Sequence, residues 1–326
     1  MALIDTYGRR INYLRLSVTD RCNMRCSYCM PAQGVAKLEH KEMLSYEELY
    51  RAAAACVAQG IEKIRVTGGE PLVRRGIVDF LGRLSAIPGL KELVLTTNGL
   101  LLDELALPLR QAGVARLNIS LDSLRAETFA KITRGADLYR VLSGIAAAQE
   151  AGFGPLKINM VVMRGVNDRE ILDFAALTLD HPFTVRFIEY MPTLLDETWG
   201  AQSMPGSEIL ARIAERYPLL PLVNSEMAGP ARNYKIQGAA GAIGIITPVS
   251  GHFCESCNRI RITASGRVRG CLFSEQGTDL KPLLASDDPG PLHEALSRIV
   301  TQKPGRHHIA EEGAEQAVVN MSRIGG

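Results

Sequence analysis

Residues 11–29 have the sequence INYLRLSVTDRCNMRCSYC. In residues 11–18 the polar and apolar side chains separate with a period of two, which predicts a β-strand. Three cysteines, Cys22, Cys26 and Cys29, follow it at a spacing typical of metal ligands. In folds built from parallel strands, binding sites form at the carboxyl ends of the strands. This stretch therefore predicts a parallel α/β fold with a ligand-binding loop after its first strand.

Five further strand patterns follow along the chain, each succeeded by a helical pattern. The predicted strands are residues 11–18, 62–67, 91–98, 114–121, 156–163 and 184–190. The predicted helices are residues 45–60, 75–86, 101–112, 138–151, 168–179 and 207–216. Such alternation builds a parallel sheet. Six units are too few for a closed eight-stranded barrel, so we predict an open partial (β/α)6 barrel of the TIM type, with a doubly wound sheet as the alternative.

The pattern changes after about residue 220, where the regular strand–helix alternation stops. Short strands are predicted at residues 234–237, 243–247, 259–263 and 268–271, together with late helices. We therefore expect two domains: the partial barrel over residues 1–220 and a small α+β carboxyl-terminal cap over residues 221–326.

Composition excludes several classes of protein. The 326 residues are 46% hydrophobic and 22% charged, as in ordinary globular proteins, and the net charge of +2 is too small for a surface that coats nucleic acid. No apolar run approaches the ~18 residues of a membrane span, and the amino terminus lacks the apolar region of a signal peptide. We therefore expect a cytoplasmic protein without membrane or nucleic-acid partners, whose cysteines are ligands rather than disulfides.

Polar side chains gather on one face of the six predicted strands, whereas strands covered on both faces are normally apolar. Five of them are basic, and they would repel each other inside a barrel unless an anion lay between them. The predicted cavity is therefore built for a highly charged anion. Its basic residues are Arg15, Lys63, Arg65, Lys157 and Arg186, and its neutral polar residues are Ser17, Thr67, Thr96, Asn98, Asn118, Ser120 and Asn159.

The first cysteine trio is one ligand short of a structural zinc site, which takes four. With His40 as fourth ligand, zinc stays an alternative. Three thiolates around a 4Fe-4S cluster would leave one iron open, and the spacing C-x3-C-x2-C, with Tyr28 before the last cysteine, resembles the radical S-adenosylmethionine superfamily. There the open iron binds the methionine moiety. The Gly-Gly-Glu-Pro run of residues 68–71 follows the second strand and is interpreted as the loop that approaches this moiety.

A second trio consists of Cys254, Cys257 and Cys271. His252 could complete a structural zinc site there. However, Arg259 and Arg261 fall on one face of the strand that leaves the trio, and an anion beside an open iron would use them. The remaining cysteine, Cys56, lies in an apolar run and is expected to be a buried hydrophobic residue.

Over essentially its whole length the chain resembles the GTP 3′,8-cyclase family, also called molybdenum cofactor biosynthesis protein A. The resemblance is carried by LRLSVTDRCNMRCSYCMP, IRVTGGEPLVRR, LTTNGLLL, NISLDSL, FIEYMP, CESCNRIRITASGRVRGCLF and the terminal Gly325-Gly326.

The resemblance implies an open (β/α)6 barrel capped by a carboxyl-terminal domain with a second 4Fe-4S cluster, whose open iron contacts the guanine base. It implies a lyase in which reductive cleavage of S-adenosylmethionine gives a 5′-deoxyadenosyl radical that takes the 3′ hydrogen of GTP. The C3′ radical then attacks C8, leading to (8S)-3′,8-cyclo-7,8-dihydroguanosine 5′-triphosphate for molybdenum cofactor (molybdopterin) biosynthesis. The cofactor carries the radical chemistry, so no side chain is assigned as catalytic.

Matching positions imply roles for individual residues. The contacts to S-adenosylmethionine are expected from Tyr28, Gly69, Ser120 and Met191. The contacts to GTP are expected from Arg15, Arg65, Thr96, Lys157, Arg259, Ile260 and Arg261, with Lys63 and Arg186 as further candidates for phosphate. The trio Cys22, Cys26 and Cys29 would hold the first cluster, and Cys254, Cys257 and Cys271 the second. Gly325-Gly326 matches a tail that enters the active site in the family.

The expected partners are GTP, a reducing electron donor such as flavodoxin or ferredoxin, and a downstream pyranopterin-forming enzyme, with a homodimer as the candidate assembly. Two other functions stay open. A radical enzyme that matures a peptide predicts more cysteines in the second domain and an apolar or mixed cavity. A two-zinc interaction module that binds RNA predicts a colourless protein with an exposed basic face.

Overall fold

The computed structural model describes residues 2–192, 199–223, 229–274, 276–307 and 321–324. Their strands form one 12-stranded sheet in the order β12-β11-β10-β1-β2-β3-β4-β5-β6-β9-β8-β7. The strands are β1 Tyr13–Ser17, β2 Lys63–Thr67, β3 Glu92–Thr97, β4 Arg116–Ser120, β5 Lys157–Val162, β6 Thr184–Glu189, β7 Leu219–Leu222, β8 Arg232–Ile236, β9 Ala242–Ile246, β10 Arg259–Ile262, β11 Arg267–Arg269 and β12 Thr278–Asp279. Strands β1 to β6 pair in parallel, as predicted. The predicted open barrel is confirmed.

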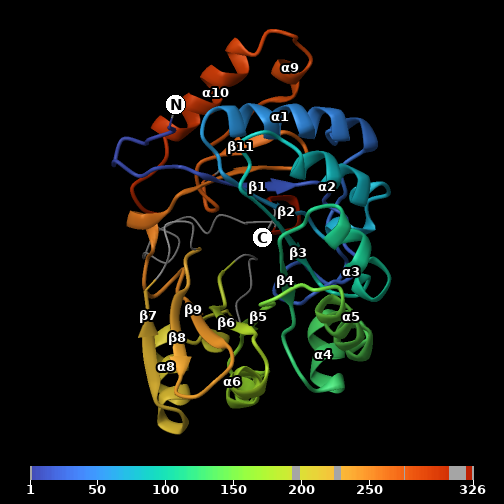
Figure 1. The fold of residues 1–326 in the computed structure, drawn as a ribbon. Coiled ribbons are helices and arrows are strands. Elements are labelled where there is room, and N and C mark those ends of the chain that lie inside the picture. The colour runs from blue at the N-terminus through green and yellow to red at the C-terminus, as the bar shows by residue number, and fades with distance from the viewer. Residues whose placement is uncertain (1, 193–198, 224–228, 275, 308–320, 325–326) are drawn as a thin grey trace.

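Helices follow the strands and cover the outer side of the curved sheet (Figure 1). They are α1 Tyr46–Ala58, α2 Ile77–Ser85, α3 Leu102–Gln111, α4 Ala126–Thr133, α5 Leu138–Glu150, α6 Ile171–Asp180, α7 Trp199–Gln202, α8 Gly206–Arg216, α9 Lys281–Leu284, α10 Gly290–Thr301 and α11 Met321–Ile324. A capping box opens the first of them: the Glu48 amide donates to the Ser45 hydroxyl, and the Ser45 amide donates to the Glu48 carboxylate. The helices α4 and α7 and the edge strands β7 and β12 were not predicted.

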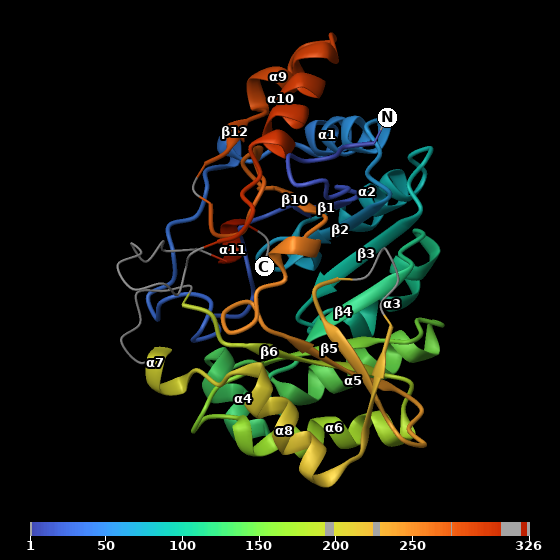
Figure 2. The same ribbon diagram turned by 90° about the vertical axis from the view of Figure 1, so that its left-hand side faces the viewer.

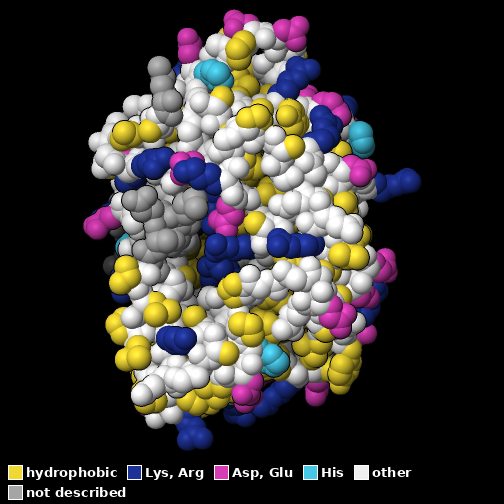
Figure 3. Space-filling model, in the orientation of Figure 1, with side chains coloured by type: hydrophobic (Ala, Val, Ile, Leu, Met, Phe, Trp, Pro, Cys, Tyr) yellow, Lys and Arg dark blue, Asp and Glu magenta, His cyan; other side chains and the backbone are white. Residues whose placement is uncertain are grey.

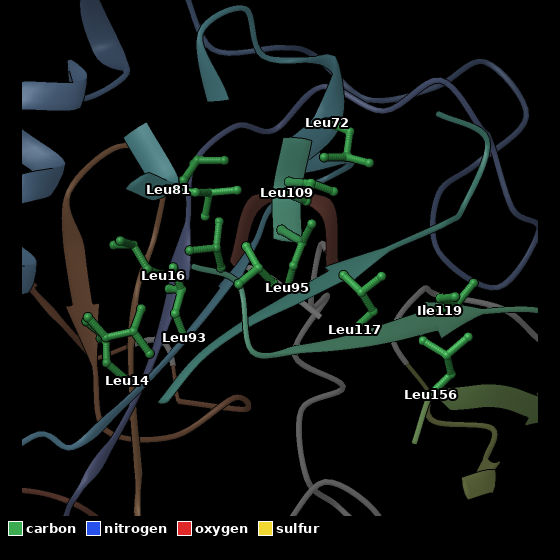
Figure 4. Packing of buried hydrophobic residues seen from close by; sticks show 14 of the residues in the cluster. Leu14, Leu16, Leu72, Leu81, Leu93, Leu95, Leu109, Leu117, Ile119 and Leu156 are labelled. Carbon is green, nitrogen blue, oxygen red and sulfur yellow. The ribbon is translucent and has the colours of Figure 1, made fainter. Parts of the chain in front are cut away.

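The main hydrophobic core lies between the outer face of the sheet and the helices. Its strand residues include Leu14, Leu16, Leu93, Leu95 and Leu117, which are almost completely buried (Figure 4). These side chains alternate with the polar set along each strand, so packing the apolar face against the helices turns the polar face inward. The core therefore fixes which side chains line the interior.

The late strands continue the sheet at both edges. Strand β10 pairs in parallel with β1, in the register Tyr13 to Arg259, and β9 pairs in parallel with β6. Figure 2 shows β10 beside β1, with α9 and α10 stacked over α1. The division into domains at residue 220 stays a prediction, but the hydrogen-bonded sheet runs across that position. Within the described residues, no helix is long and apolar enough to cross a membrane.

Candidate active site

The inner face of the sheet encloses a cavity of about 270 Å³. Both cysteine trios line it, as do polar side chains from β1 to β6 and the two arginines of β10. In Figure 3, Lys and Arg side chains gather near the middle of the face shown. Two sets of cysteines separated by more than 200 residues thus meet at one space.

The first trio lies in the loop after β1, which is braced against α4. The Ser27 amide donates to the Ile132 carbonyl at 2.9 Å. Arg134, which follows α4 with the left-handed φ of 59°, donates from one guanidinium nitrogen to the carbonyls of Arg25 (2.7 Å) and Met30 (2.8 Å). These bonds hold the loop on both sides of Cys26 and Cys29.

The thiols of this loop need a positive partner. Burial raises the pKa of Cys22 to about 11 and the pKa of Cys29 to about 12, and the neighbouring cysteines and carboxylates act in the same direction. Three thiolates can share this space only if a metal group offsets their charge.

The spacing of the sulfurs does not suit a single zinc ion. Sulfurs on one tetrahedral zinc would lie about 3.8 Å apart. Among the described residues, neither cysteine trio has its three sulfurs all within 4.8 Å of one another. His40, the fourth ligand in the zinc alternative, is exposed on a short 3-10 helix, His40–Glu42. The donor set fits a larger cluster better than one zinc ion.

The residues expected to contact S-adenosylmethionine lie around the first trio. Tyr28, Gly69, Ser120 and Met191 all line the cavity. The Tyr28 hydroxyl donates to Asp122 at 2.8 Å, and this buried carboxylate also accepts the Val161 amide at 2.9 Å. Asp122 was not predicted as a site residue, although it lies in the quoted stretch NISLDSL.

The Gly-Gly-Glu-Pro loop is held tightly against the cysteine loop. The Gly69 amide donates to the Thr19 carbonyl at 2.7 Å. Glu70 accepts from the Asn98 amide, the Thr97 hydroxyl and the Leu72 amide at 2.7–3.0 Å, and burial raises the pKa of its carboxyl to about 7. The bonds that Glu70 makes within the protein therefore fix the shape of this loop.

We expect Gly69→Ala to weaken S-adenosylmethionine binding by about tenfold or more. A Cβ at this position would collide with the Arg21 carbonyl oxygen, and backbone cannot yield as a flexible side chain can. Equilibrium dialysis of the iron-loaded protein measures the effect. Gly82→Ala is the matched control, because a Cβ there meets nothing within 4 Å. Unchanged binding by the Gly69 variant would contradict the inference that the close packing of Gly69 against the cysteine loop shapes the S-adenosylmethionine site.

The arginines of the cavity form a row across neighbouring strands. In the sheet register Arg15 lies between Arg65 of β2 and Arg261 of β10. Burial and the nearby cations lower the pKa of Arg15 to about 9. The Nε atoms of Arg15, Arg65 and Arg186 are buried and have no hydrogen-bond partner among the described residues. Buried donors without acceptors are costly, so this row fits a polyanion.

Most of the residues expected to bind GTP face the cavity. Arg15, Arg65, Thr96, Arg259 and Arg261 line it, and Arg186 does as well.

Three of the residues named for GTP or phosphate do not line the cavity. Lys63 forms an ion pair with Glu92 at 2.7 Å. Lys157 opens β5 at the end away from the cysteines, as the strand prediction implied. The side chain of Ile260 is fully buried in the hydrophobic core, because it has the opposite parity to its neighbours Arg259 and Arg261. The roles suggested for these residues stay predictions, and Gly325-Gly326 lies outside the described residues.

The second trio has a cationic environment. Lys303 donates from Nζ to the Cys257 sulfur at 3.3 Å and to the Gly270 carbonyl at 2.6 Å, and Arg259 contacts the same sulfur at 3.6 Å. Burial alone would raise the pKa of Cys257, but these two cations outweigh it and lower the pKa to about 6. Lys303 was not predicted as a site residue, since it lies 46 residues from Cys257 in no recognisable motif.

Comparison with known proteins agrees with this geometry. The radical SAM superfamily matches residues 16–178, and the family described as Molybdenum Cofactor Synthesis C matches residues 183–309. Over 326 residues, the whole of both chains, the sequence is 63% identical to the GTP 3′,8-cyclase of Geobacter sulfurreducens. The chain belongs to the GTP 3′,8-cyclase family. Another relative, the GTP 3′,8-cyclase of Moorella thermoacetica, is 47% identical over 99% of both chains.

Solved structures support the fold of this GTP 3′,8-cyclase family member. The structure of Streptococcus suis SuiB bound to S-adenosylmethionine aligns with 96% of this chain and 75% of that one, with a TM-score of 0.61 and 14% identity. Membership of the radical SAM superfamily implies a 4Fe-4S cluster and S-adenosylmethionine. The superfamily match contains the first trio, and the Molybdenum Cofactor Synthesis C match contains the second.

Proposed function

We propose that this protein converts GTP to (8S)-3′,8-cyclo-7,8-dihydroguanosine 5′-triphosphate, as the first step of molybdenum cofactor biosynthesis. The observation that carries the proposal is one cavity lined at the same time by both cysteine trios and by a row of buried arginines. A peptide substrate would not need this row, whereas a triphosphate supplies acceptors for the buried Nε atoms of Arg15, Arg65 and Arg186, which have no hydrogen-bond partner among the described residues.

In this proposal the chain binds and positions, and the cofactors do the chemistry. Cys22, Cys26 and Cys29 hold the first 4Fe-4S cluster. When bound, that cluster and S-adenosylmethionine supply one-electron cleavage of the sulfonium, and with it the 5′-deoxyadenosyl radical. Tyr28, Gly69, Ser120 and Met191 surround S-adenosylmethionine, and Asp122 orients Tyr28 through its hydrogen bond.

The rest of the cavity holds the nucleotide. Arg15, Arg65, Arg259 and Arg261 bind the triphosphate, with Thr96 and Arg186 beside them, and so fix the ribose relative to the radical source. Cys254, Cys257 and Cys271 would hold a second 4Fe-4S cluster, which would supply a contact for the guanine base. The thiolate of Cys257 is favoured by the ammonium of Lys303.

The remaining partners follow from the same assignment. A one-electron reaction needs a low-potential donor such as flavodoxin or ferredoxin, and the product needs a downstream enzyme that forms the pyranopterin. We place the reaction in the reducing cytoplasm, where such thiols stay available for cluster binding, and a homodimer is our proposed assembly.

The test is product analysis with GTP deuterated at C3′. Anaerobically reconstituted protein with S-adenosylmethionine and a strong reductant should release an isomer of GTP and 5′-deoxyadenosine that carries the deuterium. Guanosine should give neither above background. If cleavage of S-adenosylmethionine does not depend on GTP and no isomer forms, the proposed function is wrong.

GTP binding near pH 7.5 should also take up protons. Burial, followed by repulsion from Arg186 and Arg116, lowers the pKa of Lys157 to about 6, so this side chain is neutral in the ligand-free protein. The resemblance implies that Lys157 contacts GTP, and a triphosphate within its reach would favour the ammonium form and raise the pKa, which gives an uptake of up to about one proton per GTP. Calorimetry in two buffers of different ionisation enthalpy measures the uptake.

Lys157→Met separates this proton from those of GTP itself, since only the wild type should show the additional uptake. Equal proton uptake by wild type and variant would contradict the prediction.

The lowered pKa of Lys157 also has a consequence for the stability of the fold. A lysine whose pKa is 10.5 in the unfolded chain and about 6 in the folded one takes up a proton on unfolding. The contribution of Lys157 to stability should therefore increase as pH rises from about 6 toward 10.5. If the free energy of unfolding of wild type and of Lys157→Met changes equally between pH 6 and 10, the lowered pKa of Lys157 is wrong.

A further inference from the structure

A second kind of metal-ligand cluster lies beside the second cysteine trio. His252, Cys254 and His307 place one ligand atom each within 4.8 Å of the other two. In the described part of the chain, no other three histidine, cysteine or carboxylate side chains have ligand atoms that all lie within 4.8 Å of one another. Its two histidines come from segments more than 50 residues apart, so the fold and not local sequence brings them together.

The distance between the two imidazoles is informative. Nδ1 of His252 lies 3.4 Å from Nε2 of His307. A hydrogen bond between them would prefer about 3.0 Å. Two nitrogens bound tetrahedrally to one zinc ion, each at about 2.0–2.1 Å, lie about 3.3–3.4 Å apart. The pair is thus spaced for a shared ion, and a His2Cys donor set suits a borderline divalent cation.

The surrounding structure holds these ligands in place. Buried Arg9 donates to the Cys254 carbonyl at 2.6 Å, and also to the carbonyls of Pro304 (2.8 Å) and Gly305 (3.1 Å) just before His307. It therefore ties both ligand segments together through their backbones. The Phe273 ring packs against the buried His307 ring at 4.5 Å between centroids. His252 is exposed, which gives an ion a route of entry from solvent.

We propose that His252, Cys254 and His307 form a site for one zinc-like divalent cation, and that this cation competes with the second 4Fe-4S cluster for Cys254. The competition rests on the proposed function, because that function assigns Cys254 to the cluster; the cation site itself does not. With zinc bound, Cys254 is turned toward the two histidines, and the trio lacks one of its three thiolates. A fourth position on the ion is left for water or another ligand.

The cation site can be tested without either cluster. A full-length variant with Cys22, Cys26, Cys29, Cys257 and Cys271 replaced by alanine keeps His252, Cys254 and His307. Titrated with Co²⁺, it should bind one ion per chain, with a thiolate-to-cobalt charge-transfer band and intense tetrahedral d–d bands. Adding His252→Ala or His307→Ala should weaken binding by about 100-fold or more, beyond the usual 10–100-fold effect of changing an outer-shell partner.

His181→Ala is the matched control, because His181 is an exposed histidine on the loop before β6. Binding unaffected by the His252 and His307 replacements, or spectra without a thiolate band, would overturn the site. Circular dichroism checks that each variant is folded.

Competition is tested on the wild-type cysteines. Reconstitution with iron and sulfide in the presence of Zn²⁺ should give about half the iron of the zinc-free sample. The double variant His252→Ala/His307→Ala should recover full iron under the same conditions. If wild type binds one zinc ion and still assembles both clusters, the competition is wrong. Failure of the cyclase function would appear differently, as missing product from protein that carries all its iron.

Discussion

Replacing Cys22, Cys26 and Cys29 together with alanine is expected to abolish 5′-deoxyadenosine formation and to remove about half of the iron, from about eight atoms per chain to about four. The three thiols line the cavity beside Tyr28 and Gly69. Without these thiolates there is no open iron to bind S-adenosylmethionine. Iron analysis and chromatography of the reaction mixture measure both effects.

The controls separate the two trios. Cys56→Ala removes a buried cysteine of α1 that does not line the cavity, and it should leave iron and activity unchanged. Replacing Cys254, Cys257 and Cys271 should also halve the iron, but some uncoupled 5′-deoxyadenosine should still form while the GTP isomer is lost. Normal cyclisation by this second triple variant would reduce the second trio to a structural role.

Arg65→Met should weaken GTP binding by about ten- to a hundredfold. Each charge-assisted contact to phosphate contributes about 1.5–3 kcal/mol, and 1.4 kcal/mol corresponds to a factor of ten. Adding Arg15→Met should weaken binding by about a further tenfold or more. Equilibrium dialysis with GTP, GDP and guanosine measures the effect, and the preference for GTP over guanosine should shrink in both variants.

The same substitution should not destabilise the ligand-free protein. Burial and neighbouring cations lower the pKa of Arg65, so the empty cavity holds its positive charge unfavourably. Removing one cation should leave the melting temperature unchanged or raise it. Lys91→Met is the control, since it removes the charge of an exposed lysine that pairs with Glu62. If wild type binds guanosine as tightly as GTP, the arginine row does not select a triphosphate.

The barrel was predictable because each of its strands has a clear period of two and is followed by a helix. The predicted strands agree with β1 to β6 within two residues at either end. Helix α4 was missed because it is short and its N-cap residue, Arg125, makes no side-chain capping bond. Strand β7 was missed because Pro221 argues against a strand, although an edge strand tolerates it.

The candidate site was predictable where residues follow the strand period or a cysteine spacing. This rule placed Arg15, Arg65 and Arg186 on one inner face. It could not identify Lys303 or His307, because their proximity to the second trio depends on how residues 303–307 return to the barrel. Nor could it show that β9 and β10 would extend the sheet, since strand pairing is decided by tertiary packing and not by local pattern.

The pairing of β1 with β10 limits how early the sheet can be completed while the chain is being synthesised. Tyr13 leaves the ribosome about 250 residues before its partner Arg259, which at ~5–20 residues per second is a delay of roughly 12–50 s. During that time the edge of β1 is unpaired and open to other chains. The first trio is complete early, but Cys254, Cys257 and Cys271 emerge more than 200 residues later. The cavity that joins both trios can therefore form only after the segment with the second trio has been made, and the edge of β1 is exposed to unwanted strand pairing until then.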